Sequence, residues 1–131
     1  MTDIYQLIYF SELAPPTRAM EVAKIVKTAR SNNAKLNITG ILIFDGQHFC
    51  QLLEGDKTHV ATLMDTIMTD PRHHELHIAH QAISAHGRHF KDWFMAYGLA
   101  QNEALLRELA TFSNMDCLRQ LLAIVPDLDI A

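Results

Sequence analysis

Polar side chains occupy positions where the surrounding sequence predicts a hydrophobic core. Tyr9 and Ser11 alternate with apolar residues in the first apolar segment, and Gln51 lies between apolar neighbours in a later one. A buried amide without partners costs roughly 1–3 kcal/mol, so Gln51 must be hydrogen-bonded. The Tyr9 hydroxyl and the Gln51 amide each donate and accept, and a phenol can also release an electron and a proton. The two residues could form a hydrogen-bond switch, or only a satisfied polar pair in the core.

Four more residues with polar or polarizable side chains follow along the chain. Asn32 and Asn33 are expected to end the first helix, because asparagine tolerates the left-handed conformation that closes helices. Trp93 and Met95 are expected to share one face of the last predicted strand. Taken alone, Trp93 fits a core or an interface equally well, and Met95 fits a core.

Hydrophobic periodicity predicts the elements that position these residues. The predicted strands cover residues 3–11, 38–44, 47–53, 76–84 and 90–99. Helices are predicted from Pro15 to Asn33, from Asp56 to Pro71, and as two short amphipathic helices within residues 102–125, the second capped by Ser113. Residues 45–46 (DG) predict a two-residue type I′ turn, since both of its central positions favour positive φ.

This order of elements predicts an α+β fold. Right-handed crossovers produce a ferredoxin-like βαββαβ sheet with an added strand and with the first two helices on one face. Tyr9 and Gln51 would lie under those helices. The other face, with Ile8, Leu52 and Phe94, would be bare, so two short C-terminal helices are expected to cover it.

Composition and charge exclude several classes of function. A chain of 131 residues fits one domain, and a net charge of −4 with scattered Lys and Arg argues against a nucleic-acid partner. The sequence has no stretch approaching the ~18 apolar residues of a membrane span and no secretory signal at its start, so we expect a cytoplasmic protein. Cys50 and Cys117 are expected to be buried thiols rather than a disulfide.

Eight histidines raise the hypothesis of a metal site, above all His73, His74, His77 and His80. A structural zinc site needs four converging ligands at tight spacing. His77 and His80 lie three residues apart in a predicted strand and are expected on opposite faces, so we predict no metal site. Nor does the sequence contain a Ser/His/Asp or Cys/His arrangement or a glycine-rich phosphate loop, so no enzyme activity is predicted.

Six short motifs occur in order at compatible spacing. They are LIYFS (7–11), SNN (31–33), ITGIL (38–42), FCQLLEG (49–55), DPRHH (70–74) and FKDWFM (90–95). Together, over about residues 3–98, they resemble the BLUF domain, a blue-light sensor that uses flavin, in its short, single-domain form. The resemblance implies a flavin held edge-in between the first two helices: FAD, with FMN or riboflavin as alternatives.

The resemblance also implies a role for each candidate residue in a photoactive group. Tyr9 would donate an electron to the excited flavin, and Gln51 would lie between the Tyr9 hydroxyl and the N5/O4 edge of the flavin. Trp93 and Met95 would respond to the state of Gln51, and Ser11 belongs to the same group.

A second set of residues would hold the flavin. Besides Tyr9 and Gln51, the implied cofactor-binding residues are Asn32, Asn33, Ile25, Ile67, Arg72 and His73. Asn33 would pair with the O4/N3 edge, supported by Asn32, and the two isoleucines would sandwich the ring. Arg72 and His73 match the loop that the family places near the cofactor.

The chain departs from the family pattern in two places, and we expect no effector domain in it. Cys50 replaces a larger apolar residue beside Gln51, and Phe94 replaces a small polar residue between Trp93 and Met95. We expect a flavin-binding domain at residues 1–100 and a C-terminal helical cap at 101–131. The signal would then pass to a separate effector protein; self-association through an exposed sheet or helix surface is compatible with the sequence.

The sequence therefore predicts a photoreceptor in which light-driven electron and proton transfer from Tyr9 resets the hydrogen bonds of Gln51. Two alternatives stay open. One is a flavin-dependent redox enzyme that uses the same pocket. The other is a ligand-free interaction module with a ferredoxin-like fold, in which Tyr9 and Gln51 are only a core pair.

Overall fold

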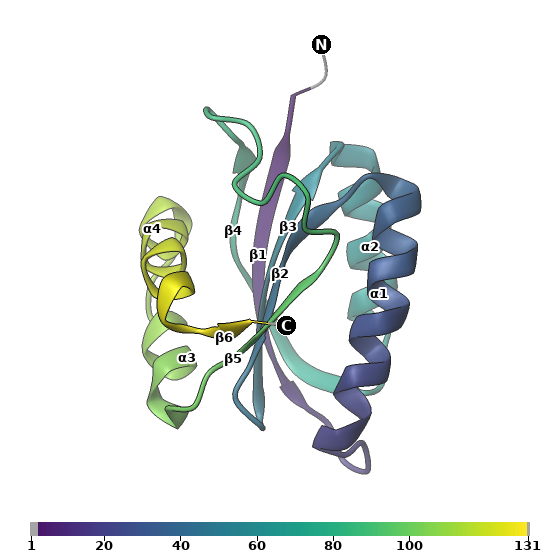
Figure 1. The fold of residues 1–131 in the computed structure, drawn as a ribbon, viewed down its shortest axis with the longest axis vertical. Coiled ribbons are helices and arrows are strands. Elements are labelled where there is room, and N and C mark those ends of the chain that lie inside the picture. Colours follow the sequence, from purple (N-terminus) through teal and green to yellow (C-terminus); the bar gives the residue numbers. More distant parts are fainter. Residues whose placement is uncertain (1–2, 131) are drawn as a thin grey trace.

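The computed structural model describes residues 3–130 and contains one mixed sheet with helices on both faces (Figure 1). In chain order the elements are β1 (Tyr5–Leu13), a 3-10 turn η1 (Ala19–Glu21), α1 (Val22–Leu36), β2 (Thr39–Phe44), β3 (His48–Gly55), α2 (Lys57–Met68), β4 (His73–Ile83), β5 (Ala96–Leu99), α3 (Glu103–Leu109), α4 (Asn114–Ile124), η2 (Val125–Asp127) and β6 (Asp129–Ile130).

The six strands are ordered β4-β1-β3-β2-β5-β6. The first four are antiparallel neighbours in the ferredoxin-like order, β5 pairs parallel with β2, and β6 pairs antiparallel with β5. The connection from β4 to β5 therefore crosses from one side of the β1-β3-β2 group to the other. The predicted α+β fold with an added strand is confirmed, and β6 is an element that the sequence pattern did not indicate.

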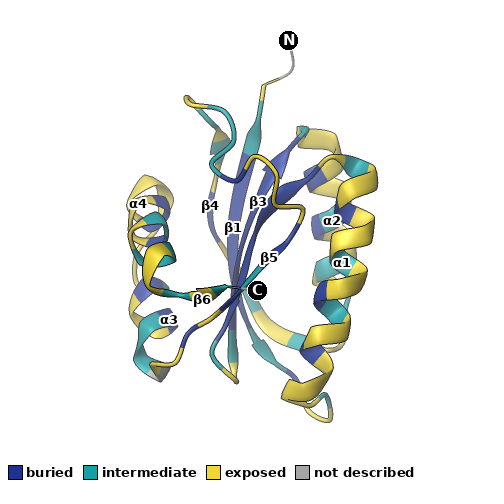
Figure 2. Cartoon of the chain, in the orientation of Figure 1, coloured by how far each residue is buried: buried dark blue, intermediate teal, exposed yellow. Residues whose placement is uncertain are grey.

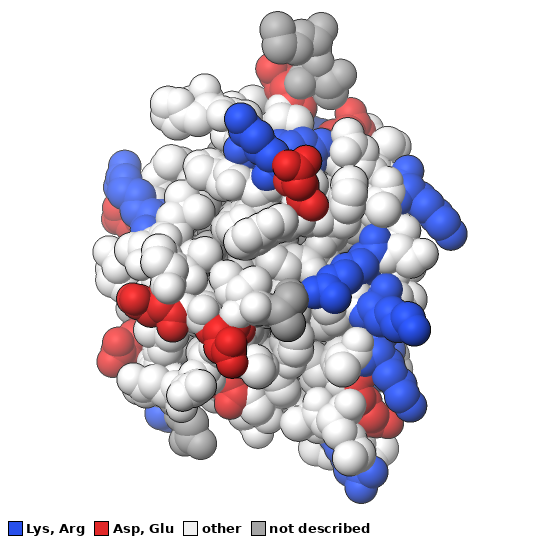
Figure 3. Space-filling view, viewed as in Figure 1, with Lys and Arg blue, Asp and Glu red and all other residues white. Residues whose placement is uncertain are grey.

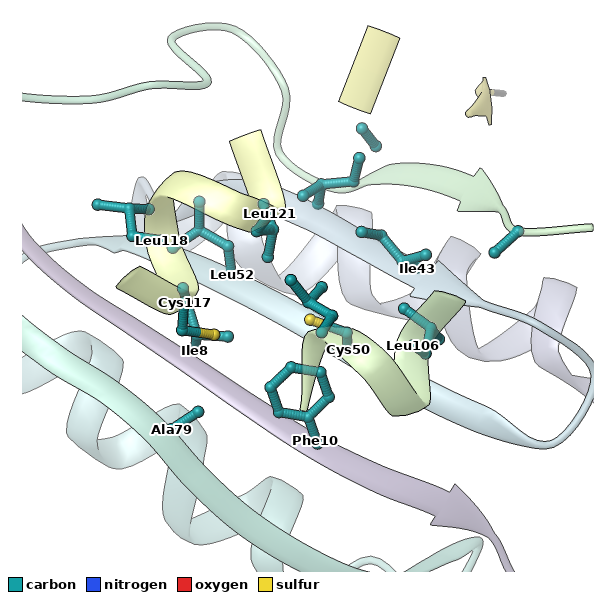
Figure 4. Close-up of a cluster of buried hydrophobic side chains, with 14 of the residues drawn as sticks. Ile8, Phe10, Ile43, Cys50, Leu52, Ala79, Leu106, Cys117, Leu118 and Leu121 are labelled. Carbon is teal, nitrogen blue, oxygen red and sulfur yellow. The ribbon is translucent and has the colours of Figure 1, made fainter. Parts of the chain in front are cut away.

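Alternation along the central strands divides the interior into two cores. Leu7 and Leu53 pack with the α1 and α2 side, whereas Ile8 and Leu52 face α3 and α4. Figure 2 shows the central strands buried and the outer faces of the helices exposed. Figure 4 shows the second core, in which Leu121 of α4 approaches Leu52. The two C-terminal helices thus cover the sheet face that would otherwise be bare, as predicted.

The first helix occupies a different range from the one predicted. It begins at Val22, directly after the η1 turn, in which the Glu21 carboxylate accepts from the Arg18 N–H at 2.7 Å. It continues to Leu36, and Asn37 takes the left-handed conformation at φ 53°. Asn32 and Asn33 are therefore inside the helix, so the prediction that they end it is wrong.

The predicted strand over residues 90–99 is also too long, since β5 begins at Ala96. Side chains satisfy much of the preceding backbone: the Glu54 carboxylate accepts from the N–H groups of His89 and Phe90 at 2.8–3.0 Å. Trp93 and Phe94 consequently do not lie on a strand, and they are 42% and 37% exposed. The expected position of Phe94 under the C-terminal helices is wrong.

The turn between β2 and β3 is located as predicted but has another geometry. Among residues 45–48 only Gly46 has positive φ, whereas type I′ requires two such residues. The Asp45 carboxylate instead accepts from the N–H groups of Gln47 and His48 at 2.9 and 2.6 Å. Such local side-chain bonds are common for aspartate in turns.

A β-bulge between β1 and β4 changes the arrangement of the histidines. His77 lies opposite Phe10, and its ring stacks on Phe10, while His80 lies opposite Ile8. Both histidines are therefore on the face toward the C-terminal helices, so the expected opposite orientation is wrong. Across residues 3–130, no group of three or more His, Cys, Asp or Glu is arranged to hold a metal ion.

Other details agree with the sequence only in part. Asp56 caps α2 by accepting from the Thr58 and His59 N–H groups, as predicted. Ser113 occupies the N-cap position of α4 but makes no side-chain cap bond.

Cys50 and Cys117 are free and buried, and burial raises the pKa of both thiols, that of Cys117 to about 11. None of the described helices has the length and apolarity to cross a membrane.

Replacement of Glu54 tests the connection that leads to β5. Its carboxylate is fully buried and binds His89 and Phe90, so Glu54→Ala leaves buried donors without partners. We expect the free energy of unfolding, measured with urea, to fall by about 3 kcal/mol. Glu12→Ala, at a half-buried carboxylate on β1, is the control, with an expected loss below about 1 kcal/mol. Equal losses in the two variants would contradict this role of Glu54.

Because the His80 side chain is buried, we expect the free energy of unfolding to decrease as the pH falls. Burial lowers its pKa below 6.5, and its ring Nε2 donates to the Gln6 Oε1 at 2.8 Å. Below about pH 6.5 the unfolded chain takes up a proton that the folded chain resists, so stability decreases. His80→Gln should therefore reduce the difference in unfolding free energy between about pH 7.5 and 5.5. His86→Gln, at an exposed position, should leave that difference unchanged; a His80 variant as pH-sensitive as the wild type would refute the assignment.

Candidate functional site

A cavity of about 150 Å³ lies between α1, α2 and the face of the sheet that carries Tyr9 and Gln51. Its lining residues come from both helices, from the three strands β1, β2 and β3, and from the segment that leads into β4. They are Tyr9, Ile25, Thr28, Ala29, Asn32, Asn33, Leu42, Phe49, Gln51, Leu63, Thr66, Ile67, Asp70, Arg72 and His73. All eight residues predicted to hold a cofactor are in this set, although the sequence alone did not indicate several of their neighbours.

The floor of the cavity is a chain of hydrogen bonds through Gln51. Antiparallel pairing places Tyr9 directly opposite Gln51, and the Tyr9 hydroxyl donates to the Gln51 Oε1. The Gln51 Nε2 donates to the Met95 sulfur at 3.4 Å. All three side chains are at least 95% buried. Burial raises the pKa of Tyr9 far above its usual value, so its hydroxyl stays protonated and available as a donor.

Asn33 carries an unsatisfied acceptor at the edge of the cavity. Its Nδ2 donates to the Phe94 carbonyl at 2.8 Å, but its Oδ1 has no hydrogen-bond partner, and the residue is only 1% exposed. Gln6 Nε2 is the other such atom among the described residues, and Gln6 does not line the cavity. Buried polar atoms are nearly always paired, so Asn33 Oδ1 requires a donor, which a ligand with an N–H group would provide.

The walls of the cavity are apolar and belong to two different helices. Ile25 and Ala29 come from α1, and Leu63 and Ile67 come from α2. Period 3.6 places each pair on one helix face. Such walls suit a flat ring whose polar edge points to a few fixed hydrogen-bonding groups.

His73 connects three elements at the end of the cavity near β4. Its Nε2 lies 2.5 Å from the Ile67 carbonyl, which can only accept, so Nε2 carries the proton. Its Nδ1, 2.8 Å from the Ser11 oxygen, therefore accepts from that hydroxyl. Ser11 thus contacts His73, which lines the cavity, but is not itself part of the lining.

Arg72 and Asp70 form an ion pair at the same end. Arg72 Nη2 lies 2.6 Å from Asp70 Oδ2, and this bond lowers the pKa of the Asp70 carboxyl. The aspartate orients the guanidinium, whose side chain remains about half exposed. The predicted contact of Arg72 with a cofactor stays a prediction.

Trp93 differs most from its expected place. It does not line the cavity, and its ring stacks on Phe90 with 5.3 Å between centroids. Met95, by contrast, points inward and reaches Gln51. Since neither residue is on a strand, alternation does not put them on one face, and the predicted shared face is wrong.

Arg30 and Glu54 are two contributors that sequence reasoning did not select. Arg30 Nε donates to the Met95 carbonyl at 2.8 Å, and Glu54 binds the backbone before Trp93. Glu54 directly follows the apolar residues Leu52 and Leu53. For Arg30, on an exposed helical position, no signal existed without the fold.

The geometry fits a flavin. The pyrimidine-like edge of that ring has an N–H flanked by two carbonyl groups, which matches the unsatisfied Asn33 Oδ1 and the nearby Gln51 amide. The ring faces are apolar and match the isoleucines of α1 and α2. The residues that line the cavity are therefore chemically compatible with a flavin.

Comparison with known proteins gives the same assignment. Residues 4–96 match the family model described as BLUF, sensors of blue-light using FAD. The blue light- and temperature-regulated antirepressor BluF of Escherichia coli is 37% identical over 70 residues, which is 53% of this chain and 17% of that protein. The photoactivated adenylate cyclase subunit beta of Euglena longa is 33% identical over 116 residues, 88% of this chain and 13% of that protein.

Solved structures agree in fold. The dark-state structure of BlrB, described as a BLUF protein, matches with a TM-score of 0.72 and 30% identity, over 85% of this chain and 84% of that one. Klebsiella pneumoniae BlrP1, solved with manganese and cyclic diGMP, matches with a TM-score of 0.72 and 31% identity over 95% of this chain and 33% of its own. The chain thus spans under a fifth of the two curated relatives but most of BlrB. On the matched length and the geometry of its cavity, this chain belongs to the BLUF family of blue-light sensors that use flavin.

Proposed function

We propose that this protein is a blue-light photoreceptor that holds FAD between α1 and α2 and has no catalytic activity of its own. The observation that carries the proposal is the Gln51 amide, which is buried at the floor of the cavity and bonded on one side to Tyr9 and on the other to Met95. A buried amide with a different partner at each end can exchange those partners by rotation, without a change of the backbone.

Each residue then has a defined task. The flavin, when bound, supplies the absorption of blue light and, once excited, a strong electron acceptor. Tyr9 supplies the electron, and its hydroxyl proton leaves along the hydrogen bond to Gln51 Oε1. Because burial disfavours the charged phenolate, Tyr9 begins and ends the cycle protonated. Gln51 is left with a changed set of partners when the electron and the proton have both returned to Tyr9.

The remaining candidate residues orient and protect the site. Asn33 accepts a hydrogen bond from the polar edge of the ring through Oδ1, Asn32 supports that end, and Ile25 and Ile67 exclude water from the ring faces. His73 fixes the end of α2 against β1 through Ile67 and Ser11. Water exclusion strengthens the hydrogen bonds of Gln51, since they act at low dielectric.

The output proceeds from Met95 to the neighbouring backbone. A change at Gln51 alters its bond to Met95, which directly precedes β5, and β5 pairs with β2 and β6. Trp93 and Phe94 lie just before it and are partly exposed, so they report the change at the surface. We propose that a separate effector protein reads this surface, and that residues 101–131 act as a cap on the 1–100 flavin-binding domain.

Removal of either end of the Tyr9–Gln51 bond tests the switch. Tyr9→Phe and Gln51→Leu should retain flavin, because the walls and Asn33 are intact, but the light-induced shift of the flavin absorption should fall by at least about tenfold. The measurement is an absorption spectrum of the purified protein before and after blue illumination.

The same strand provides a matched control pair. The Tyr5 hydroxyl donates to Gln81 at 2.7 Å outside the cavity, so Tyr5→Phe and Gln81→Leu remove a comparable bond. These variants should shift like the wild type. A full shift in Tyr9→Phe or Gln51→Leu would reject the proposed switch, and a wild type that turns over its flavin with a reductant in the dark would favour a redox enzyme instead.

Loss of the unsatisfied acceptor tests the cofactor assignment. Asn33→Ala removes Oδ1, and the affinity for added FAD, measured by titration of flavin fluorescence, should decrease by about tenfold. Ser31→Ala, at an exposed position on the same helix, should bind FAD as the wild type does. An unchanged affinity in Asn33→Ala would show that the ring edge lies elsewhere.

A further inference from the structure

The segment before β5 is held by an unusual set of hydrogen bonds. The carbonyl groups of the consecutive residues Trp93, Phe94 and Met95 accept from three different donors: the backbone N–H of Gly40, the Nδ2 of Asn33 and the Nε of Arg30, each at 2.8 Å. Only the first donor belongs to the sheet. The other two are side chains of α1, so the helix determines where this irregular segment lies.

Arg30 and Asn33 are three residues apart and therefore lie on one face of α1. Asn33 is buried and lines the main cavity, whereas Arg30 is exposed and borders a second hollow with Asp92, Trp93 and Ile130. Lys24, Lys27 and Lys35 are also exposed along this helix, and Figure 3 shows basic side chains gathered on the α1 side of the molecule.

Arg30 binds Met95, the residue that also accepts a hydrogen bond from Gln51. Its Nε binds the carbonyl of Met95, and the sulfur of the same Met95 accepts from Gln51 Nε2 at 3.4 Å. A thioether is a weak acceptor on a flexible side chain, so this bond depends on how well the Met95 backbone is fixed. Met95 is 2% exposed and cannot shift without disturbing its neighbours.

We propose that Arg30 is a positioning residue of the switch: by holding the Met95 carbonyl it keeps the Met95 sulfur against the Gln51 amide and so sets the lifetime of the light-induced state. This inference rests on the proposed photoreceptor function and deepens it. Arg30 does not line the cavity and binds the Met95 carbonyl, so the proposal requires its effect on the switch to depend on Met95.

A double-mutant cycle isolates this path. The rate of return of the flavin spectrum in the dark is measured for Arg30→Gln, Met95→Ala and the double variant, each loaded with flavin. Loss of one hydrogen bond to a charged donor should change the return rate of Arg30→Gln by about fivefold. In the Met95→Ala background the same Arg30 change should alter the rate by less than about 1.5-fold, because the sulfur that Arg30 positions is gone.

Two further variants separate this role from charge and from folding. Lys27→Gln removes the same charge one turn earlier on the exposed side of α1 and should return at the wild-type rate. Arg30→Lys keeps a cationic donor and should lie between the wild type and Arg30→Gln. Flavin content, measured for every variant, should stay at the wild-type level because Arg30 does not line the cavity.

The outcomes distinguish the two levels of the account. Equal rate changes from Arg30→Gln with and without Met95 would overturn the positioning role, as would a rate for Arg30→Gln equal to that of Lys27→Gln. In both cases the wild-type shift itself would be intact. A wild type that binds flavin and shows no light-induced shift would instead overturn the proposed function.

Discussion

The structure depends on one buried amide that is satisfied at both ends. Gln51 lies in the middle of a central strand, where an unpaired amide would be strongly unfavourable, and it is tolerated because Tyr9 donates to its oxygen and Met95 accepts from its nitrogen. The register of β1 against β3 provides the first partner, and the segment before β5 provides the second. A change in either partner must therefore be felt at the other through the same amide.

Two layers of helices exclude water from this amide and fix the position of its neighbours. On one face α1 and α2 form the cavity, and on the other α3 and α4 bury the apolar side of the same strands. Cys50, the neighbour of Gln51 in β3, faces α3 and α4. The two faces thus share each backbone unit of β3. A displacement of β3 or β5 that accommodates new hydrogen bonds on one face also changes the packing on the other face. A small local change can be transmitted to the surface in this way.

Much of this arrangement could be predicted from the sequence, because it depends on alternation and on helix periodicity. The two faces of β1 and β3, the cap at Asp56 and the covering of the sheet by the C-terminal helices all follow from such patterns. Tyr9 and Gln51 were identifiable as polar residues on a buried face.

The rest could not be predicted because it depends on tertiary hydrogen bonds between segments distant in sequence. The Glu54 carboxylate binds the N–H groups of His89 and Phe90, and side chains of α1 bind the carbonyls of Phe94 and Met95, so the segment before β5 follows tertiary hydrogen bonds. A bulge between His77 and His80 in β4 places both side chains on one face of the sheet, although strict alternation predicts opposite faces. Local propensity carries no information on either event.

The most direct test of the account is the side-chain amide of Gln51 observed by NMR in protein labelled with ¹⁵N-glutamine and loaded with flavin. Its Nε2 resonance, assigned from its absence in Gln51→Leu, should shift on blue illumination and return in the dark at the same rate as the flavin absorption. The other glutamine side chains should change much less. A flavin spectrum that shifts while the Gln51 amide resonance stays in place would contradict the claim that this amide is the switch.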